Sequence, residues 1–256
     1  MKTILITGAS SGIGRATAKL FAKSKDFQLI LCARRIDKLE QLKLELKDTP
    51  IHLLQFDVQD FKACEQAIQS IPDTFSTVDI LLNNAGLALG LDTIDEGNLT
   101  HWNTMIDTNI KGLLYMTKLL SRKMVVNKSG HIINICSTAG KDVYPKGNVY
   151  CATKFAVDAL TKAIRQDLVP YNIRVSQVAP GHVEETEFAI TRFEGDVDRA
   201  KIYNDFNPLT SRDVAEAIYF IATRPAHVNI QDILITPTQQ ASASLINRSG
   251  RIYDPE

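Results

Sequence analysis

Short apolar segments alternate with longer amphipathic segments along the chain, and this alternation limits the available folds more than any other feature. The short segments are continuous and rich in Ile, Leu and Val, as expected of strands covered on both faces; they are residues 3–7, 27–33, 51–57, 78–84, 131–137, 173–179 and 232–237. Helical patterns lie between them, at residues 13–24, 37–48, 60–70, 100–126, 151–169 and 212–223. Strands that alternate with helices predict right-handed crossovers and a parallel sheet.

The length of the chain fits one such unit. Its 256 residues are enough for one large domain with a full core or for two small ones. Because we find no linker, repeat or low-complexity segment, we predict one α/β domain over residues 1–256. Its fold is a doubly wound parallel sheet (Rossmann fold) of about seven strands with helices on both faces. Ligands bind at the carboxyl ends of strands in such sheets, so we interpret the irregular residues 182–210 as a substrate lid.

The charge balance and the cysteines exclude several classes of protein. Lys plus Arg number 29 and Asp plus Glu number 29, so the formal net charge is zero. We therefore expect no nucleic-acid partner and no membrane partner, which would require a basic excess or face. No apolar segment reaches the length of about 18 residues that a membrane span needs, and the first residues lead into a glycine turn rather than a cleavage site. The four cysteines form no CxxC pair, so we expect reduced thiols, no metal site and a cytoplasmic location.

A glycine-rich turn, "TGASSGIG" at residues 7–14, joins the first predicted strand to the first helix. Gly8 permits the tight turn, Gly12 lets the backbone approach a ligand, and Gly14 lets the helix pack close to the strand. The helix then offers N–H groups and a partial positive charge to a pyrophosphate. A plain strand-to-helix turn is the alternative, but the place of this turn at the first strand–helix junction favours a dinucleotide site.

The end of the second predicted strand, "CARR" at residues 32–35, indicates which dinucleotide. A cofactor with a free ribose 2′-hydroxyl usually meets Asp or Glu here, but this chain has Ala33 followed by Arg34 and Arg35. A carboxylate would repel a 2′-phosphate, whereas guanidinium groups bind it through charge-assisted hydrogen bonds. The pattern predicts NADP rather than NAD, unless both arginines simply begin a surface helix.

Tyr150 and Lys154 stand four positions apart in "VYCATKFAVDAL", residues 149–160, and would share one face of a helix. In isolation they could be two ordinary surface residues. A tyrosine with a pKa of about 10 is a poor base near neutral pH, and a neighbouring ammonium group would lower that pKa. Ser137 ends the fifth predicted strand, where its hydroxyl would hold a substrate oxygen. We predict Tyr150 as the general base.

Taken in order, these motifs resemble the short-chain dehydrogenase/reductase family over nearly the full chain. The residues that carry the resemblance are "TGASSGIG" (7–14), Asp57, "NNAG" (83–86), Asn109, Ser137, "YCATK" (150–154), and "PG" (180–181) with Thr186 beyond it. Within the family the chain is most similar to the NADP-dependent 3-hydroxy acid dehydrogenases that oxidise serine and L-allo-threonine. That similarity lies in residues 32–42, 180–188, 191–196, 224–230 and 235–242.

The resemblance implies an NADP-binding oxidoreductase with the catalytic set Asn109, Ser137, Tyr150 and Lys154. It further implies that Lys154 binds the nicotinamide ribose, that Asn109 holds a water linking Lys154 to solvent, and that Val183 and Thr186 meet the carboxamide. Together with the residue-based interpretation, it predicts these cofactor-binding residues: Gly8, Ser10, Ser11, Gly12, Ile13, Gly14, Arg34, Arg35, Asp57, Val58, Asn84, Tyr150, Lys154, Val183 and Thr186.

A 3-hydroxy acid carries a carboxylate that needs a cationic or N–H partner. Arg192, in the predicted lid, is our candidate, with Lys141 and Lys146 as others; an exposed lid charge is the alternative for Arg192. Ser137, Tyr150 and Arg192 are therefore the predicted substrate-binding residues. His182 could touch the substrate, but we expect a solvated loop histidine.

The predicted function is hydride transfer between NADP and a small 3-hydroxy acid such as serine, allo-threonine or 3-hydroxyisobutyrate. One alternative is an NADPH-dependent reductase of bulkier ketones or 3-oxoacyl thioesters, which would require an open lid. The other is a non-catalytic NADP-binding sensor, which would not need the full catalytic set. Predicted helices 100–126 and 151–169 carry apolar residues beyond one buried stripe, and family members pair them between subunits, so we expect a homotetramer.

Overall fold

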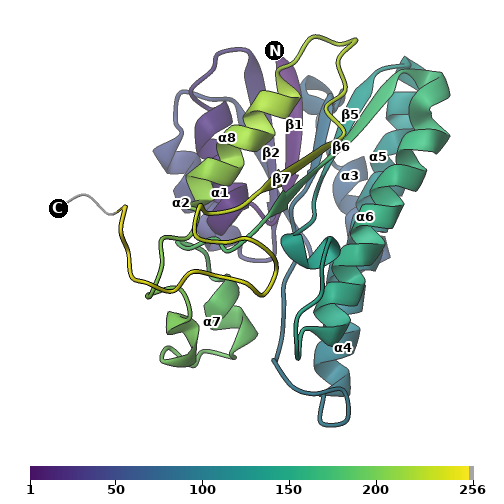
Figure 1. Ribbon diagram of the computed structural model, residues 1–256. Coiled ribbons are helices and arrows are strands. Elements are labelled where there is room, and N and C mark those ends of the chain that lie inside the picture. Colours follow the sequence, from purple (N-terminus) through teal and green to yellow (C-terminus); the bar gives the residue numbers. More distant parts are fainter. Residues whose placement is uncertain (254–256) are drawn as a thin grey trace.

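The computed structural model describes residues 1–253, and this part of the chain forms one parallel sheet in the order β3-β2-β1-β4-β5-β6-β7 (Figure 1). All neighbouring strands are parallel. Their bounds are β1 Lys2–Thr7, β2 Phe27–Ala33, β3 Ile51–Gln55, β4 Ile80–Asn83, β5 Gly130–Ile135, β6 Ile173–Pro180 and β7 Asp232–Ile235. The prediction of about seven parallel strands is confirmed. The strand order reverses between β1 and β4, where such sheets bind their ligands.

Helices cover both faces of the sheet, as predicted for a doubly wound fold (Figure 1). Buried side chains of α1, α2 and α8 share one core cluster, and those of α3 and α5 share another, against which α6 also packs. The longer helices are α1 Gly12–Phe21, α2 Ile36–Glu45, α3 Phe61–Gln69, α4 Leu99–Ile106, α5 Leu113–Asn127, α6 Asn148–Leu168, α7 Phe188–Arg192 and α8 Ser211–Ala222. Short 3₁₀ turns lie at Asp73–Phe75, Thr138–Gly140, Val169–Tyr171 and Arg199–Lys201.

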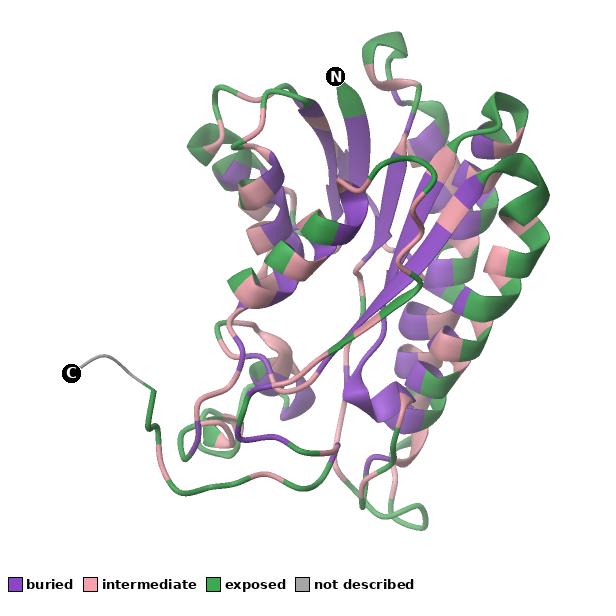
Figure 2. Ribbon diagram, turned by 45° about the horizontal axis from the view of Figure 1, so that its top comes forward, coloured by how far each residue is buried: buried purple, intermediate pink, exposed green. Residues whose placement is uncertain are grey.

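The central strands are buried on both faces, which explains their continuous apolar sequence. Successive side chains of a strand point to opposite faces. Ile4 and Ile6 therefore join the cluster under α1 and α8, whereas Leu5 joins the cluster under α3 and α5. Figure 2 shows the centre of the sheet as buried between exposed helix faces.

Two features differ from the expected elements. The predicted helix 100–126 is interrupted by a π-helical segment, Asp107–Gly112, which contains Asn109; extra residues of this kind inside a helix often mark functional sites. The last strand ends at Ile235 rather than at residue 237, and residues 236–253 run across the predicted lid (Figure 1). There the N–H of Gly250 donates to the carbonyl of Asp205 at 3.0 Å. The chain after the last strand thus packs against the predicted lid, at the carboxyl-end edge of the sheet.

Candidate active site

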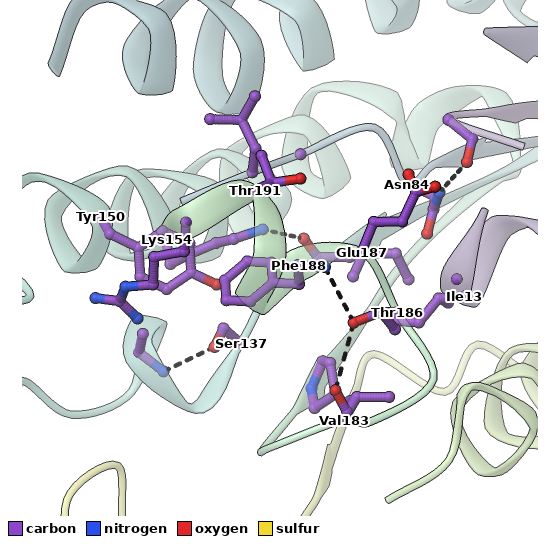
Figure 3. Close-up of a pocket in the computed structure, with 18 of the residues that line it drawn as sticks. Ile13, Asn84, Ser137, Tyr150, Lys154, Val183, Thr186, Glu187, Phe188 and Thr191 are labelled. Carbon is purple, nitrogen blue, oxygen red and sulfur yellow. Dashed lines mark hydrogen bonds between the residues drawn. The ribbon is translucent and has the colours of Figure 1, made fainter. Parts of the chain in front are cut away.

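A cleft of about 520 Å³ opens at the carboxyl ends of the strands (Figure 3). Its walls come from the glycine-rich turn, the loops after β2 to β6, residues of the 182–210 segment and the C-terminal segment. The predicted site residues line this cleft except Gly14, Asn109 and the alternative cations Lys141 and Lys146. Motifs that are far apart in the chain therefore meet at one cleft.

The glycine-rich turn has the backbone shape that its sequence predicts. Gly8 and Gly12 adopt φ angles of +67° and +50°, in the left-handed region that favours glycine. A Cβ on Gly14 would lie 2.5 Å from the carbonyl oxygen of Gly8, so no larger residue fits. Asn84 Nδ2 donates to the carbonyls of Thr7 at 2.9 Å and Gly8 at 3.2 Å, which ties the turn to β4. This side-chain-free cradle at a helix N-terminus fits a pyrophosphate.

Cationic side chains gather at the end of β2, beside the turn. Arg34 lies 3.5 Å from the carboxylate of Asp57. Arg35 Nη2 donates to the hydroxyls of Ser10 at 3.1 Å and Ser11 at 3.3 Å. Two guanidinium groups, two hydroxyls and no carboxylate at position 33 fit a ribose 2′-phosphate.

The structure brings the predicted catalytic side chains together from separate elements. Tyr150 and Lys154 lie on α6, are only 8% and 7% exposed, and border the cleft. Ser137 follows β5, and its hydroxyl accepts a hydrogen bond from the N–H of Ala139 at 3.1 Å. A further hydrogen bond joins Ser137 to the Tyr150 hydroxyl. One face of α6 therefore meets the carboxyl end of β5, as the sequence predicted.

The structure does not show the lowered Tyr150 pKa that we expected from Lys154. Burial raises the pKa of Tyr150 well above its usual range, and the hydrogen bond from Ser137 and the charge of Arg192 oppose that rise. Lys154 Nζ lies 5.9 Å from the Tyr150 ring centre and donates instead to the carbonyl of Ile135 at 2.9 Å. Burial also lowers the pKa of Lys154. Burial therefore decides the direction of the shift in the Tyr150 pKa, although Lys154 lies one helical turn away.

Asn109 has a more structural position than its predicted role implied. Its Nδ2 donates to the carbonyl of Leu87 at 2.8 Å and to Thr153 Oγ1 at 3.1 Å, and its Oδ1 accepts from the N–H of Leu87 at 2.9 Å. A Cβ on Gly86 would lie 3.3 Å from Asn109 Oδ1 and 3.6 Å from Lys154 Nζ. Asn109 and Lys154 therefore border the same small space, which stays open because residue 86 is glycine.

Arg192 is buried beside Tyr150, so the alternative of an exposed charge is wrong. It is 8% exposed, and its Nε donates to the carbonyl of Gly90 at 3.1 Å. The N–H of Gly90 donates in return to the carbonyl of Arg192 at 2.9 Å. The guanidinium carbon lies 5.4 Å from the ring centre of Tyr144 and 5.8 Å from that of Tyr150. Arg192 thus places its guanidinium group next to Tyr144 and Tyr150.

The other candidate side chains lie elsewhere or differ from expectation. Lys141 forms ion pairs with Asp158 and Asp232 and does not line the cleft; Lys146 is exposed and does not line it either. Our expectation of a solvated His182 is wrong. Its ring packs against Phe206 and Tyr203, and burial lowers its pKa, because the 182–210 segment folds aromatic side chains over it.

Comparison with known proteins decides the family. A family model described as short chain dehydrogenase matches residues 2–196. The chain belongs to the short chain dehydrogenase family. The resemblance seen in its motifs is thereby confirmed.

Similar proteins and structures extend over almost the whole chain. The NADP-dependent 3-hydroxy acid dehydrogenase of Schizosaccharomyces pombe is 42% identical over 251 residues, which are 96% of each chain. A structure of the closed form of serine dehydrogenase complexed with NADP+ has a TM-score of 0.92 at 42% identity, over 95% of this chain and 98% of that one. A serine dehydrogenase structure from Escherichia coli has a TM-score of 0.81 at 39% identity, over 93% and 99%.

Several cleft-lining residues of this family member were not found from its sequence. The aromatic ones include Phe188, Phe193 and Tyr203, and the C-terminal ones include Ile246 and Arg248. Aromatic residues in the otherwise irregular segment 182–210 were the available signal for the first group. Nothing in the local pattern after β7 indicated the second group, because its place depends on a long-range contact with the 182–210 segment.

Proposed function

We propose that this protein transfers a hydride between NADP and a small 3-hydroxy acid. The observation that carries the proposal is the guanidinium of Arg192, buried in the cleft beside Tyr150. A buried charge requires a partner, and the carboxylate of a hydroxy acid is a suitable one. The names of the relatives, NADP-dependent 3-hydroxy acid dehydrogenase and serine dehydrogenase, agree with this substrate class.

The residues of the cleft fit NADP as the cofactor. The backbone of the glycine-rich turn would hold the pyrophosphate, and Arg34 with Arg35 would hold the 2′-phosphate. Val183 and Thr186 would meet the carboxamide at the other end, next to Lys154. When bound, NADP supplies the hydride acceptor for alcohol oxidation, or in reduced form the donor.

Ser137 and Tyr150 would act on the substrate oxygen. The two hydroxyls are hydrogen-bonded to each other, so both can reach one oxygen atom placed beside them. In oxidation Tyr150 accepts the hydroxyl proton as general base, and Ser137 donates a hydrogen bond that holds the oxygen. The positive charge of Arg192 favours the phenolate against the effect of burial. The same charge orients the carboxylate end of the substrate.

We further propose that residues 182–210 form a lid and that the present arrangement is the closed one. The higher TM-score to the closed serine dehydrogenase, 0.92 against 0.81 for the other serine dehydrogenase structure, supports this. Phe188 at the start of α7 packs its ring against Tyr150 with centres 5.7 Å apart. A closed lid favours small substrates over bulky ketones.

A homotetramer and a cytoplasmic location are further proposals. Leu114 on α5 and Phe155 on α6 leave apolar side chains 37% and 42% exposed, which supports contacts between subunits; sedimentation velocity showing a monomer would contradict the tetramer. Among the described residues no helix is long and apolar enough to cross a membrane.

Initial rates at the reduced-nicotinamide absorbance band test the function directly. NADP and NAD should be compared with serine, allo-threonine, 3-hydroxyisobutyrate and 3-hydroxypropionate. We expect turnover with NADP and at least one of these acids. NADPH binding without turnover of any acid would contradict the proposal and favour a bulkier ketone substrate or a sensor.

The Tyr150→Phe variant tests the mechanism. We expect it to lower kcat by at least about 10²-fold, the contribution typical of general acid–base catalysis, while NADPH binding measured by fluorescence is retained. Tyr171→Phe, which changes a half-exposed tyrosine after α6, is the matched control. Unchanged turnover in Tyr150→Phe would exclude the tyrosine as the base.

A further inference from the structure

Glu187 joins the proposed lid to the cationic end of the cleft. Its carboxylate forms a two-point ion pair with Arg35, with distances of 2.6 Å to Nη2 and 3.1 Å to Nη1. The same carboxylate lies 2.6 Å from Lys38 Nζ on α2. These contacts connect residues about 150 positions apart in the chain. Neither the motifs nor the catalytic mechanism accounts for them.

The neighbours of Glu187 reach two other parts of the cleft. Thr186 lies against the glycine-rich turn, since a Cβ on Gly12 would be 3.1 Å from Thr186 Cγ2. Phe188 packs against Tyr150, and Figure 3 shows its ring between Tyr150 and Thr186. Thr186 therefore contacts the turn, Glu187 the cations after β2, and Phe188 the ring of Tyr150. A displacement of Glu187 would move both neighbours.

Arg35 is shared between the lid and the turn. While it holds Glu187, its Nη2 also donates to the hydroxyls of Ser10 and Ser11. Lys38, in contrast, binds Glu187 but does not line the cleft. The two cations therefore have separable roles, because Lys38 can act on the lid without contacting a bound dinucleotide.

We propose that Glu187 is a positioning residue that latches the lid to Arg35 and Lys38, so that occupancy of the 2′-phosphate site sets the position of Thr186 and Phe188 over the reaction centre. The inference rests on the proposed NADP-dependent function. A guanidinium group can bind a carboxylate in its plane and keep further N–H groups for a phosphate. Arg35 would then be held by both anions in the closed state, and the lid would close most firmly over NADP.

Limited trypsin digestion measures the latch independently of turnover. Arg199 and Lys201 are exposed in the lid, and cleavage after them can be identified by mass spectrometry. We expect NADP to protect these sites in the wild-type protein. In Glu187→Gln and in Lys38→Met the cleavage rate with NADP should rise at least about fivefold, as expected for the loss of a partly exposed charge-assisted hydrogen bond. Glu187→Asp, which keeps the charge, should restore part of the protection.

Cofactor affinity separates a latch from a simple change of charge near the phosphate site. Glu187→Gln removes a negative charge there, which alone would lower the Kd of NADPH. Loss of a latch that stabilises the NADP-bound closed state should instead raise the Kd. Lys38→Met removes a positive charge, so the Kd should stay the same or rise. Both variants should raise KM for the hydroxy acid. The double variant should raise KM little more than either single variant does, because each substitution removes the same interaction.

Glu185→Gln is the control, since it removes an exposed carboxylate of the same segment that is distant in sequence from the two cleavage sites. If Glu187→Gln and Lys38→Met keep wild-type protection and wild-type KM, the latch is overturned. If the wild-type protein turns over no hydroxy acid, the proposed function fails, whereas the digestion result still decides the latch.

Discussion

At the scale of single residues, Arg192 is the group whose role the structure makes most specific. Its guanidinium group is held by the Gly90 carbonyl and lies beside the rings of Tyr144 and Tyr150. We expect Arg192→Met to raise KM for 3-hydroxypropionate at least about 30-fold, because a buried charged partner is lost. Arg192→Lys keeps the charge but not the planar guanidinium group, so its KM should lie between the values of Arg192→Met and the wild type.

The matched measurement uses 1,3-propanediol, which has the hydroxyl group but no carboxylate. In Arg192→Met its rate should fall less than that of the acid, because only the effect of Arg192 on the Tyr150 phenolate is lost. Arg199→Met, at an exposed arginine of the same lid, should leave both substrates unaffected. An equal loss on acid and diol would exclude Arg192 as the partner of the carboxylate.

At the scale of elements, the C-terminal segment is attached to the lid by a buried glutamine. Gln239 is 6% exposed; its Nε2 donates to the carbonyls of Asn247 at 3.1 Å and Gly250 at 3.0 Å. Its Oε1 accepts from the N–H of Asn207 at 2.8 Å. Each backbone group left unpaired while buried costs about 1–3 kcal/mol, so Gln239→Leu should release the segment rather than keep it docked.

Hydrogen–deuterium exchange followed by mass spectrometry checks this prediction. Exchange should accelerate in residues 239–253 and near Asn207, while the amides of the central strands stay protected. KM for the hydroxy acid should rise several-fold, because Ile246 and Arg248 line the cleft. Gln69→Leu, on the exposed side of α3, is the control; identical exchange in both variants would contradict the attachment.

At the scale of the whole molecule, a buried histidine links stability to pH. His131 on β5 is 1% exposed, its Nε2 lies 2.8 Å from Ser176 Oγ, and burial, with smaller effects from Arg174 and Lys2, lowers its pKa from 6.5 to about 3. Between these values the unfolded chain binds a proton that the folded protein excludes. The free energy of unfolding should therefore fall by up to about 1.4 kcal/mol per pH unit as the pH drops below 6.5.

Urea unfolding between pH 7.5 and 4.5 measures this dependence. His131→Gln should show a flatter profile than the wild type over that range, even if it is less stable at pH 7.5. His227→Gln changes an exposed histidine and should keep the wild-type slope. Below pH 4.5 the carboxylate of Glu187 adds to the loss, since its ion pairs with Arg35 and Lys38 lower its pKa to about 2. Parallel profiles for all three proteins would exclude His131 as the source.

The sequence by itself determined the sheet and the edge of the sheet at which the motif residues lie. Apolar periodicity, the glycines at 8, 12 and 14, and the Tyr150–Lys154 spacing act over a few residues, so they can be interpreted without the fold. The carboxyl ends of parallel strands meet at one edge, which is why Ser137 and the glycine-rich turn could be assigned to the same site.

Only the tertiary structure decided the parts that depend on contacts between distant segments. It buried Arg192, packed His182 against aromatic rings, placed part of the segment 236–253 in the wall of the cleft, and paired Glu187 with Arg35 and Lys38. It also reversed the expected shift in the pKa of Tyr150, because the loss of hydration depends on everything that encloses the side chain. Burial and electrostatic environment belong to the assembled molecule, and local sequence patterns do not contain them.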